Sequence, residues 1–197
     1  LISPDNEPPA EAQLLEQEHV LAPLQLVLQS GTVDEYAAAQ GATIRQWLAD
    51  GQDGALISGA LWRVNAAYSR LVPLLPKGSM GRITGAQPVE ERRNDQSKSL
   101  ILATPTVDIG YNFVKLGKAR QNLDFVIFDA RFQDEFFQRL GRAGRVLGKP
   151  QQDIPAHAIA LLAEEAVAKL KERDGQTITR QEFAAFVRDK GIIGAKD

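Results

Sequence analysis

The sequence contains no cysteine and only two histidines. Without cysteine, the chain forms no disulfide and offers no thiolate to a metal. His19 and His157 lie far apart in the sequence, and at each position a histidine satisfied within the fold is the better interpretation. The stretch DGQTITRQEF resembles the end of an EF-hand loop, but loop positions 1 and 12 would be Leu170 and Gln181. We therefore expect no metal site in this chain.

Long apolar runs and an excess of basic charge are also lacking. No run of about 18 apolar residues occurs, so we expect no membrane span. The chain starts with Leu rather than Met and shows no signal peptide, so we expect it to be part of a longer protein. The formal net charge is −2. A nucleic-acid partner would therefore have to meet a local basic patch rather than a global positive field.

Short apolar runs alternate with helical patterns after residue 50. Val64, Ala67 and Leu71 follow one another at helical spacing, which predicts a helix between the first two runs. The runs 99–104, 124–130 and 156–162 predict strands, as continuous apolar stretches do in buried parallel sheets. Two further short strands are predicted at 55–60 and 81–85, on either side of the predicted helix. Strands that alternate with helices predict an α/β fold with an open, mostly parallel sheet flanked by helices.

The sheet domain is predicted to span residues 51–162, with one segment on either side. Residues 1–50 are predicted to be a linker with short helices, because residues 10–29 have a helical composition interrupted near Pro23. Residues 163–197 are predicted to be a C-terminal helical extension, in which the capping-box sequence TRQE opens the last helix.

The stretch QRLGRAGR, residues 138–145, places two arginines after a buried strand, each behind a glycine. If the helix that starts at Asp134 continues through it, Gln138, Arg142 and Arg145 share one face. An apolar stripe then occupies the opposite side: Phe136, Leu140, Ala143 and Leu147. Guanidinium groups match phosphate oxygens, and an arginine that reaches a γ-phosphate across an interface accelerates its transfer. The alternative is an exposed basic face paired with carboxylates.

Four segments in order resemble the motifs of a known family. Residues 138–145 resemble motif VI of superfamily 2 helicases, which lies in the second of their two RecA-like domains. Residues 101–113 (ILATPTVDIGYNF) resemble motif V, residues 81–92 (GRITGAQPVEER) the motif before it, and residues 55–67 (ALISGALWRVNAA) motif IV. Within this superfamily the chain is most similar to the helicase subunit of CRISPR type I systems, and among these to the type I-D version. The resemblance implies a RecA-like fold.

The resemblance also implies which residues meet the nucleotide. Arg142 and Arg145 would contact the γ-phosphate, and Gln138 the nucleotide or its water. Asp108, Gly110 and Asn112 would lie on the loop that faces the cleft. Many superfamily members have Gly-x-Asp where this chain has Gly-Tyr-Asn, which leaves the contact to the ribose open. An ordinary helix cap is the alternative interpretation of Asp108.

A second group of residues would contact nucleic acid. Thr84, Gly85 and Thr104 follow predicted strands, where hydroxyls and backbone amides suit phosphate contacts. Further charge is expected from Arg92 on a predicted helix and from the loop VKLGKARQ with Lys115 and Lys118. A solvated helix face and a plain surface loop are the alternatives for these basic residues.

The chain lacks the loop that would hold the phosphates of the nucleotide. The pattern G-x-x-x-x-G-K-[ST] does not occur, and FDAR at 128–131 lacks the second acid of a magnesium-binding Asp-Glu pair. ATP with magnesium would therefore be bound mainly by a first RecA-like domain outside this sequence, and this chain alone is expected to be inactive.

The predicted function is that of the C-terminal motor half of an ATP-dependent DNA helicase in CRISPR type I interference, in the prokaryotic cytoplasm. Its expected partners are single-stranded DNA, the first RecA-like domain, the CRISPR effector complex and a separate nuclease subunit. Two alternatives stay open: another superfamily 2 motor, such as a restriction translocase or a repair helicase, and a non-enzymatic module that binds nucleic acid or the effector complex.

Overall fold

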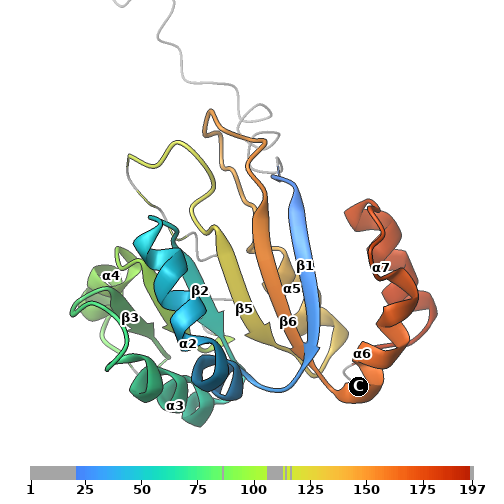
Figure 1. The fold of residues 1–197 in the computed structure, drawn as a ribbon, viewed down its shortest axis with the longest axis horizontal. Helices are drawn as coiled ribbons and strands as arrows, with labels where there is room; N and C mark the ends of the chain where they lie inside the picture. The colour runs from blue at the N-terminus through green and yellow to red at the C-terminus, as the bar shows by residue number, and fades with distance from the viewer. Residues whose placement is uncertain (1–20, 86, 106–112, 114, 116, 196–197) are drawn as a thin grey trace, which may run out of the picture.

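The computed structural model describes residues 21–85, 87–105, 113, 115 and 117–195. Figure 1 shows the strands of these residues side by side in one sheet, with helices on both sides. The elements in chain order are β1 (Leu24–Ser30), α2 (Val33–Ala49), β2 (Gly54–Ile57), α3 (Leu61–Leu71), β3 (Met80–Ile83), α4 (Val89–Gln96), β4 (Leu100–Ala103), β5 (Phe125–Asp129), α5 (Gln133–Leu140), β6 (Ala156–Leu162), α6 (Glu164–Leu170), a 3-10 turn (Lys171–Arg173) and α7 (Arg180–Asp189).

The sheet has six parallel strands in the order β1-β6-β5-β2-β4-β3. This confirms the predicted open α/β fold, and the five predicted strands correspond to β2 through β6. Because all strands run in one direction, their carboxyl ends meet along one edge of the sheet, which we call the carboxyl edge. Their amino ends meet along the opposite edge, which we call the amino edge.

Helices cover both faces of the sheet (Figure 1). Alternate residues of each strand point to opposite faces. In β2, Leu56 joins the core under α2 and α3, whereas Ala55 and Ile57 join the core shared with α5, α6 and α7. In β5, Ile127 joins the core under α2 and α3, and Val126 joins the core shared with α5, α6 and α7. Strands buried on both faces explain why the apolar runs in the sequence are continuous rather than alternating.

The segment before residue 51 differs from its prediction. Leu24–Ser30 was expected to be helical, but it forms β1, which pairs with β6 at the edge of the sheet. Burial alternates along β1, since Leu24, Leu26 and Leu28 pack on the core while Gln25 and Val27 are exposed. The sheet that we expected to begin at residue 51 therefore begins at Leu24.

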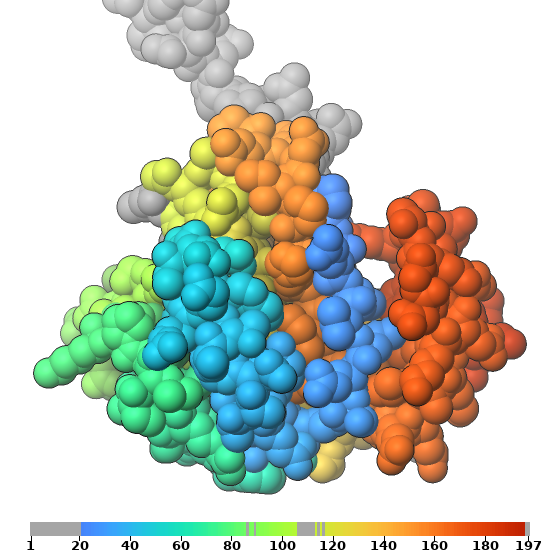
Figure 2. Space-filling model, in the orientation of Figure 1, coloured from blue at the N-terminus to red at the C-terminus, as the bar shows by residue number. Residues whose placement is uncertain are grey.

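The C-terminal helices pack against the core of the sheet. Phe183, Phe186 and Val187 of α7 are buried in the cluster that contains β5 and β6. The predicted capping box is confirmed, because the Thr179 N–H donates to Glu182 Oε2 at 2.8 Å and the Glu182 N–H donates to Thr179 Oγ1 at 3.1 Å. A groove of about 670 Å³ separates β1 from α6 and α7, and its mouth is visible in Figure 2.

In the part of the chain that the structure describes, no helix is long and apolar enough to cross a membrane. Within the same residues, no group of three or more His, Cys, Asp or Glu side chains is placed to hold a metal ion.

Candidate nucleotide and nucleic-acid contact sites

The two arginines of QRLGRAGR lie on a turn rather than on a helix face. Helix α5 ends at Leu140, and Gly144 then has a φ of +75°, which no helix residue adopts. The prediction that Gln138, Arg142 and Arg145 share one helical face is therefore wrong. Gln138 is exposed on α5, Arg142 is only 5% exposed, and Arg145 is half-buried. We call residues 141–145 the arginine turn.

The predicted apolar stripe holds only in part. Phe136, Leu140 and Ala143 are buried as expected, but Leu147 is half-buried and has a φ of +52°. Val146 is buried in its place, with no exposed surface. The register of the stripe changes because the helical backbone has ended before these residues.

The arginine turn is held by segments from both ends of the chain. The Ala22 N–H donates to the Gly144 carbonyl at 2.8 Å, and Arg180 Nη2 donates to the carbonyls of Ala22 and Ala143 at 3.3 Å each. Arg145 Nε donates to the Gly141 carbonyl at 2.8 Å. A Cβ added to Gly144 would lie 3.2 Å from the Ala22 carbonyl oxygen. Because Gly144 has no side chain, the backbone of Ala22 can pack directly against it.

Arg139 is a buried residue that the sequence analysis missed. Its side chain is 1% exposed, and Nη1 donates to the Asp129 carbonyl. The guanidinium also lies 3.9 Å from Asp129 Oδ1 and 3.7 Å from Glu135 Oε1. Arg139 follows Phe136 by three residues and Glu135 by four, so it lies on the core side of α5. This spacing in the sequence could have indicated that Arg139 is buried.

The Asp129 carboxylate gathers groups from three elements at the carboxyl edge. Ser58 Oγ, just after β2, donates to Asp129 Oδ2 at 2.8 Å, and the Gly59 N–H lies 3.4 Å from Oδ1. Arg63 Nη1 on α3 lies 3.4 Å from Oδ2. Together with Arg139, these residues form the Asp129 network. It fixes the turn between β2 and α3 to the end of β5.

Three hydroxyl residues lie next to one another along the carboxyl edge. The Ser58 N–H donates to the Ala103 carbonyl at 3.1 Å, and the Thr104 N–H donates to the Ile83 carbonyl at 3.1 Å. These bonds set Ser58, Thr104 and Thr84 at the ends of the neighbouring strands β2, β4 and β3. We call them the hydroxyl row. The structure thus brings together the predicted contacts Thr84 and Thr104, and the sequence analysis missed Ser58.

The surroundings of Thr84 are mixed in charge. The Thr84 N–H, one of the amides expected to take a phosphate, donates to Gln87 Oε1 at 3.0 Å. Gly85 is exposed and Arg92 is half-buried on α4. Two exposed acids, Glu90 and Glu91, occupy the first turn of the same helix. The repulsion between these carboxylates and a phosphate weakens the case for Arg92 as a phosphate contact.

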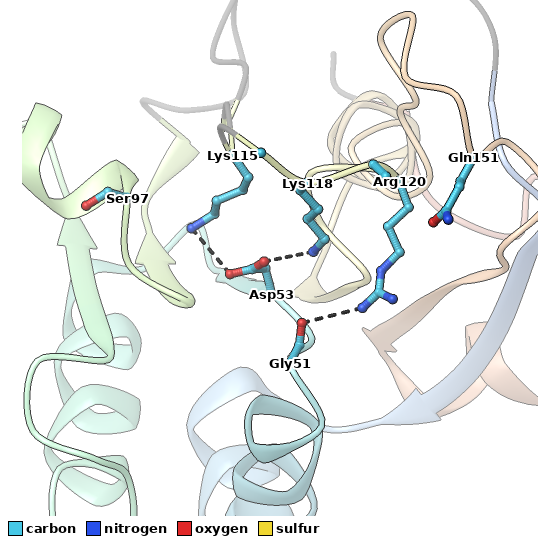
Figure 3. Close-up of a pocket in the computed structure, with 9 residues that line it drawn as sticks. Gly51, Asp53, Ser97, Lys115, Lys118, Arg120 and Gln151 are labelled. Carbon is cyan, nitrogen blue, oxygen red and sulfur yellow. Dashed lines mark hydrogen bonds and ion pairs between the residues drawn. The ribbon is translucent and has the colours of Figure 1, made fainter.

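Lys115 and Lys118 lie at the amino edge, away from the hydroxyl row. They line a pocket of about 610 Å³ that opens beside the start of β2, and Figure 3 shows both side chains pointing toward Asp53. Lys118 Nζ lies 2.8 Å from Asp53 Oδ2 and also pairs with Asp124, while Lys115 Nζ lies 3.5 Å from Asp53 Oδ1. Lys115 and Lys118 therefore lie at the opposite edge of the sheet from Thr84 and Thr104.

Burial lowers the pKa of Lys115, and the nearby Asp53 carboxylate offsets part of that effect. Burial likewise lowers the pKa of Lys149, whose ammonium donates to the Lys115 carbonyl at 3.0 Å. The pocket thus holds cations already engaged by carboxylates and carbonyls. Asp108, Gly110 and Asn112 lie outside the described residues.

Solved structures share this fold. The chain aligns with T. fusca Cas3 at a TM-score of 0.60 and 16% identity, over 88% of this chain and 24% of that one. The chain has a RecA-like fold. It aligns with the helicase MrfA bound to DNA and AMPPNP at a TM-score of 0.56 and 11% identity, over 83% and 23% of the two chains.

The RecA-like domain is also similar to the UvsW helicase of bacteriophage T4, at a TM-score of 0.51 and 12% identity, over 92% of this chain and 56% of that one. The chain therefore spans from about a quarter to about half of the length of these three structures. No protein-family profile and no curated protein matches the sequence. In fold, the chain is a helicase-like domain.

Proposed function

We propose that this RecA-like domain is the second motor domain of an ATP-dependent superfamily 2 helicase or translocase. The observation that carries the proposal is the position of two candidate contact sets on one domain. The hydroxyl row lies at the carboxyl edge, where ligands of open α/β sheets bind. The arginine turn lies near Ala156, at the amino edge, where α5 ends.

The arginine turn would serve a nucleotide held by another domain. The sequence has no phosphate-binding loop of its own, so ATP and magnesium would be bound mainly by a first RecA-like domain. Arg145 is the more accessible arginine of the pair, whereas Arg142 at 5% exposure lies within the domain. We therefore assign the contact to the γ-phosphate to Arg145 first. Gln138, exposed one turn earlier, would approach the nucleotide from α5.

The hydroxyl row would hold the phosphate backbone of a single strand. Thr104 is the first proposed donor, because it is half-buried, whereas Thr84 is only 7% exposed. Ser58 has no exposed surface, and the Asp129 network holds it beside the two threonines. Helix α5 connects the two sets, because Arg139 ties it to the end of β5 and its last residue precedes the arginine turn. ATP binding would draw the two domains together, and hydrolysis would release them, so that the grip on the strand alternates.

The biological setting that we propose is CRISPR type I interference. The motifs in the sequence support it, and the likeness to Cas3 in fold agrees with it. In that setting the motor would track DNA displaced by the effector complex and deliver it to a separate nuclease. A restriction or repair motor would use the same two contact sets. The assignment to CRISPR type I interference therefore depends on the sequence motifs.

ATP hydrolysis in the presence of single-stranded DNA tests the motor function. The full-length protein that contains this domain should hydrolyse ATP, and this domain alone should not. Arg145→Ala in the full-length protein should reduce turnover by about 10³- to 10⁵-fold, as loss of an arginine finger does. Arg45→Ala, at an exposed position of α2, is the matched control and should leave turnover unchanged. Turnover that is indifferent to Arg145 would leave a nucleic-acid-binding module without a motor role.

A further inference from the structure

Trp62 is exposed where most aromatic side chains are buried. It lies in the first turn of α3, and 62% of the residue is exposed. The neighbouring Leu61 is 48% exposed. By contrast, Trp47 packs its ring on Phe125, with 4.8 Å between the ring centroids. An indole left in water gives up the stabilisation that burial of its large apolar area provides, so a ligand that covers the exposed ring would recover it.

The ring of Trp62 is held in place from one side. The guanidinium of Arg63 lies over the ring, 5.1 Å from its centroid. Arg63 is itself fixed by two carboxylates, because Nη1 lies 3.4 Å from Asp129 Oδ2 and Nε lies 3.9 Å from Asp34 Oδ1. A cation anchored in this way limits the rotation of the indole, which lowers the entropy lost when a ligand binds to its exposed surface.

The position of Trp62 identifies the class of ligand. Helix α3 begins at Leu61, directly after the turn that carries Ser58, so Trp62 lies at the carboxyl edge. The Arg63 guanidinium that packs on its ring pairs with Asp129, which also accepts the Ser58 hydroxyl. Surfaces that bind single strands combine groups that follow the phosphates with aromatic rings on which bases stack. The hydroxyl row has no ring of its own, and Trp62 supplies one at the same edge.

We propose that Trp62 stacks on a base of a single-stranded nucleic acid whose phosphates lie along the hydroxyl row. This inference rests on the proposed function, because it needs the strand at the carboxyl edge. Stacking accepts any base, so Trp62 would add affinity without sequence preference. A strand that slides past a fixed ring would release one base and stack the next.

Binding of two labelled oligonucleotides to the full-length protein tests this proposal. One is an oligothymidylate, and the other is an abasic strand of the same length, which keeps the phosphates and lacks the bases. Trp62→Ala should weaken binding of the oligothymidylate by about 5- to 150-fold and leave binding of the abasic strand unchanged. Trp62→Phe should recover most of the affinity, since it keeps a ring. Fluorescence anisotropy measures both dissociation constants.

Val72→Ala is the matched control, because Val72 is 50% exposed directly after the other end of α3. It should not change either dissociation constant. Trp62→Ala without effect on the oligothymidylate, or with an equal effect on both strands, would overturn the stacking. If Thr104→Val still weakens the binding of both oligonucleotides in that case, the proposed function is retained without the stacking. Failure of the unaltered protein to bind either strand would overturn both.

Discussion

Replacing Arg139 with methionine should destabilise the domain by about 3 kcal/mol. Methionine approximates the length of the arginine stem and fills most of its space, so the loss of the charge dominates over the loss of packing. Arg139 is 1% exposed and engages both the carbonyl and the carboxylate of Asp129. Its removal leaves the buried carbonyl without this donor and takes one cation from a carboxylate that is itself only 8% exposed.

The magnitude follows from what remains around Asp129. Breaking a buried ion pair costs about 3–5 kcal/mol when the remaining charge is left uncompensated. Here the carboxylate keeps the Ser58 hydroxyl at 2.8 Å, the Gly59 N–H at 3.4 Å and Arg63 at 3.4 Å. Those contacts place the expected cost at the lower end of the range.

Urea denaturation measures the effect. With an m-value of about 2 kcal/mol per molar urea, a loss of about 3 kcal/mol shifts the midpoint down by about 1.5 M. Arg45→Met, at an exposed position of α2, is the control and should shift the midpoint by less than about 0.3 M. A shift for Arg139→Met as small as that of the control would refute the role assigned to the Asp129 network. A double-mutant cycle with Asp129→Asn should give a coupling of about 1 kcal/mol or more.

Two further predictions concern other parts of the domain. Gly144→Ala should lower the free energy of unfolding by more than about 1–2 kcal/mol, because the strain of a left-handed backbone adds to crowding against Ala22. Gly78→Ala is the control, because Gly78 has a φ of +82° with open space around it and should show the strain alone. Equal losses for the two variants would contradict the crowding at Gly144. Hydrogen bonds with Thr179 lower the pKa of Glu182 below its usual 4.5. The stability that the Glu182 carboxylate contributes as a cap is therefore complete above pH 4.5 and is lost as the pH falls through the lowered pKa. An NMR titration of the Glu182 carboxyl should place the midpoint below 4.5, and Thr179→Ala should move it upward; a midpoint at or above 4.5 in the unaltered protein would contradict the capping box.

The sheet could be predicted from the sequence because its central strands are buried on both faces. Continuous apolar runs such as 99–104 and 124–130 have no other good interpretation at that length. The segment 24–30 was different, since only alternate residues of this edge strand are partly buried and the stretch adjoins a helical composition. Its pairing with β6 depends on a partner far along the chain, which local patterns do not reveal.

The backbone of the candidate site could not be predicted from the sequence. The motif identified Arg142 and Arg145, but helical periodicity predicted that the helix continues past Leu140. In the structure α5 ends at Leu140, and the backbone turns at Gly144. A glycine in a pattern does not show whether its φ is negative or positive. Arg139 was overlooked because charged residues are assumed to face solvent, whereas a carboxylate at the end of β5 stabilises this one inside.

The pairing of β1 with β6 has a consequence for how the chain is made. Leu24 lies next to Ala156 in the sheet, so β1 leaves the ribosome about 130 residues before its neighbour β6. At about 5–20 residues per second, that delay is on the order of ten seconds. During this time the alternating apolar side of β1 has no sheet to cover it. A chaperone that shields this segment during translation should therefore raise the yield of folded protein.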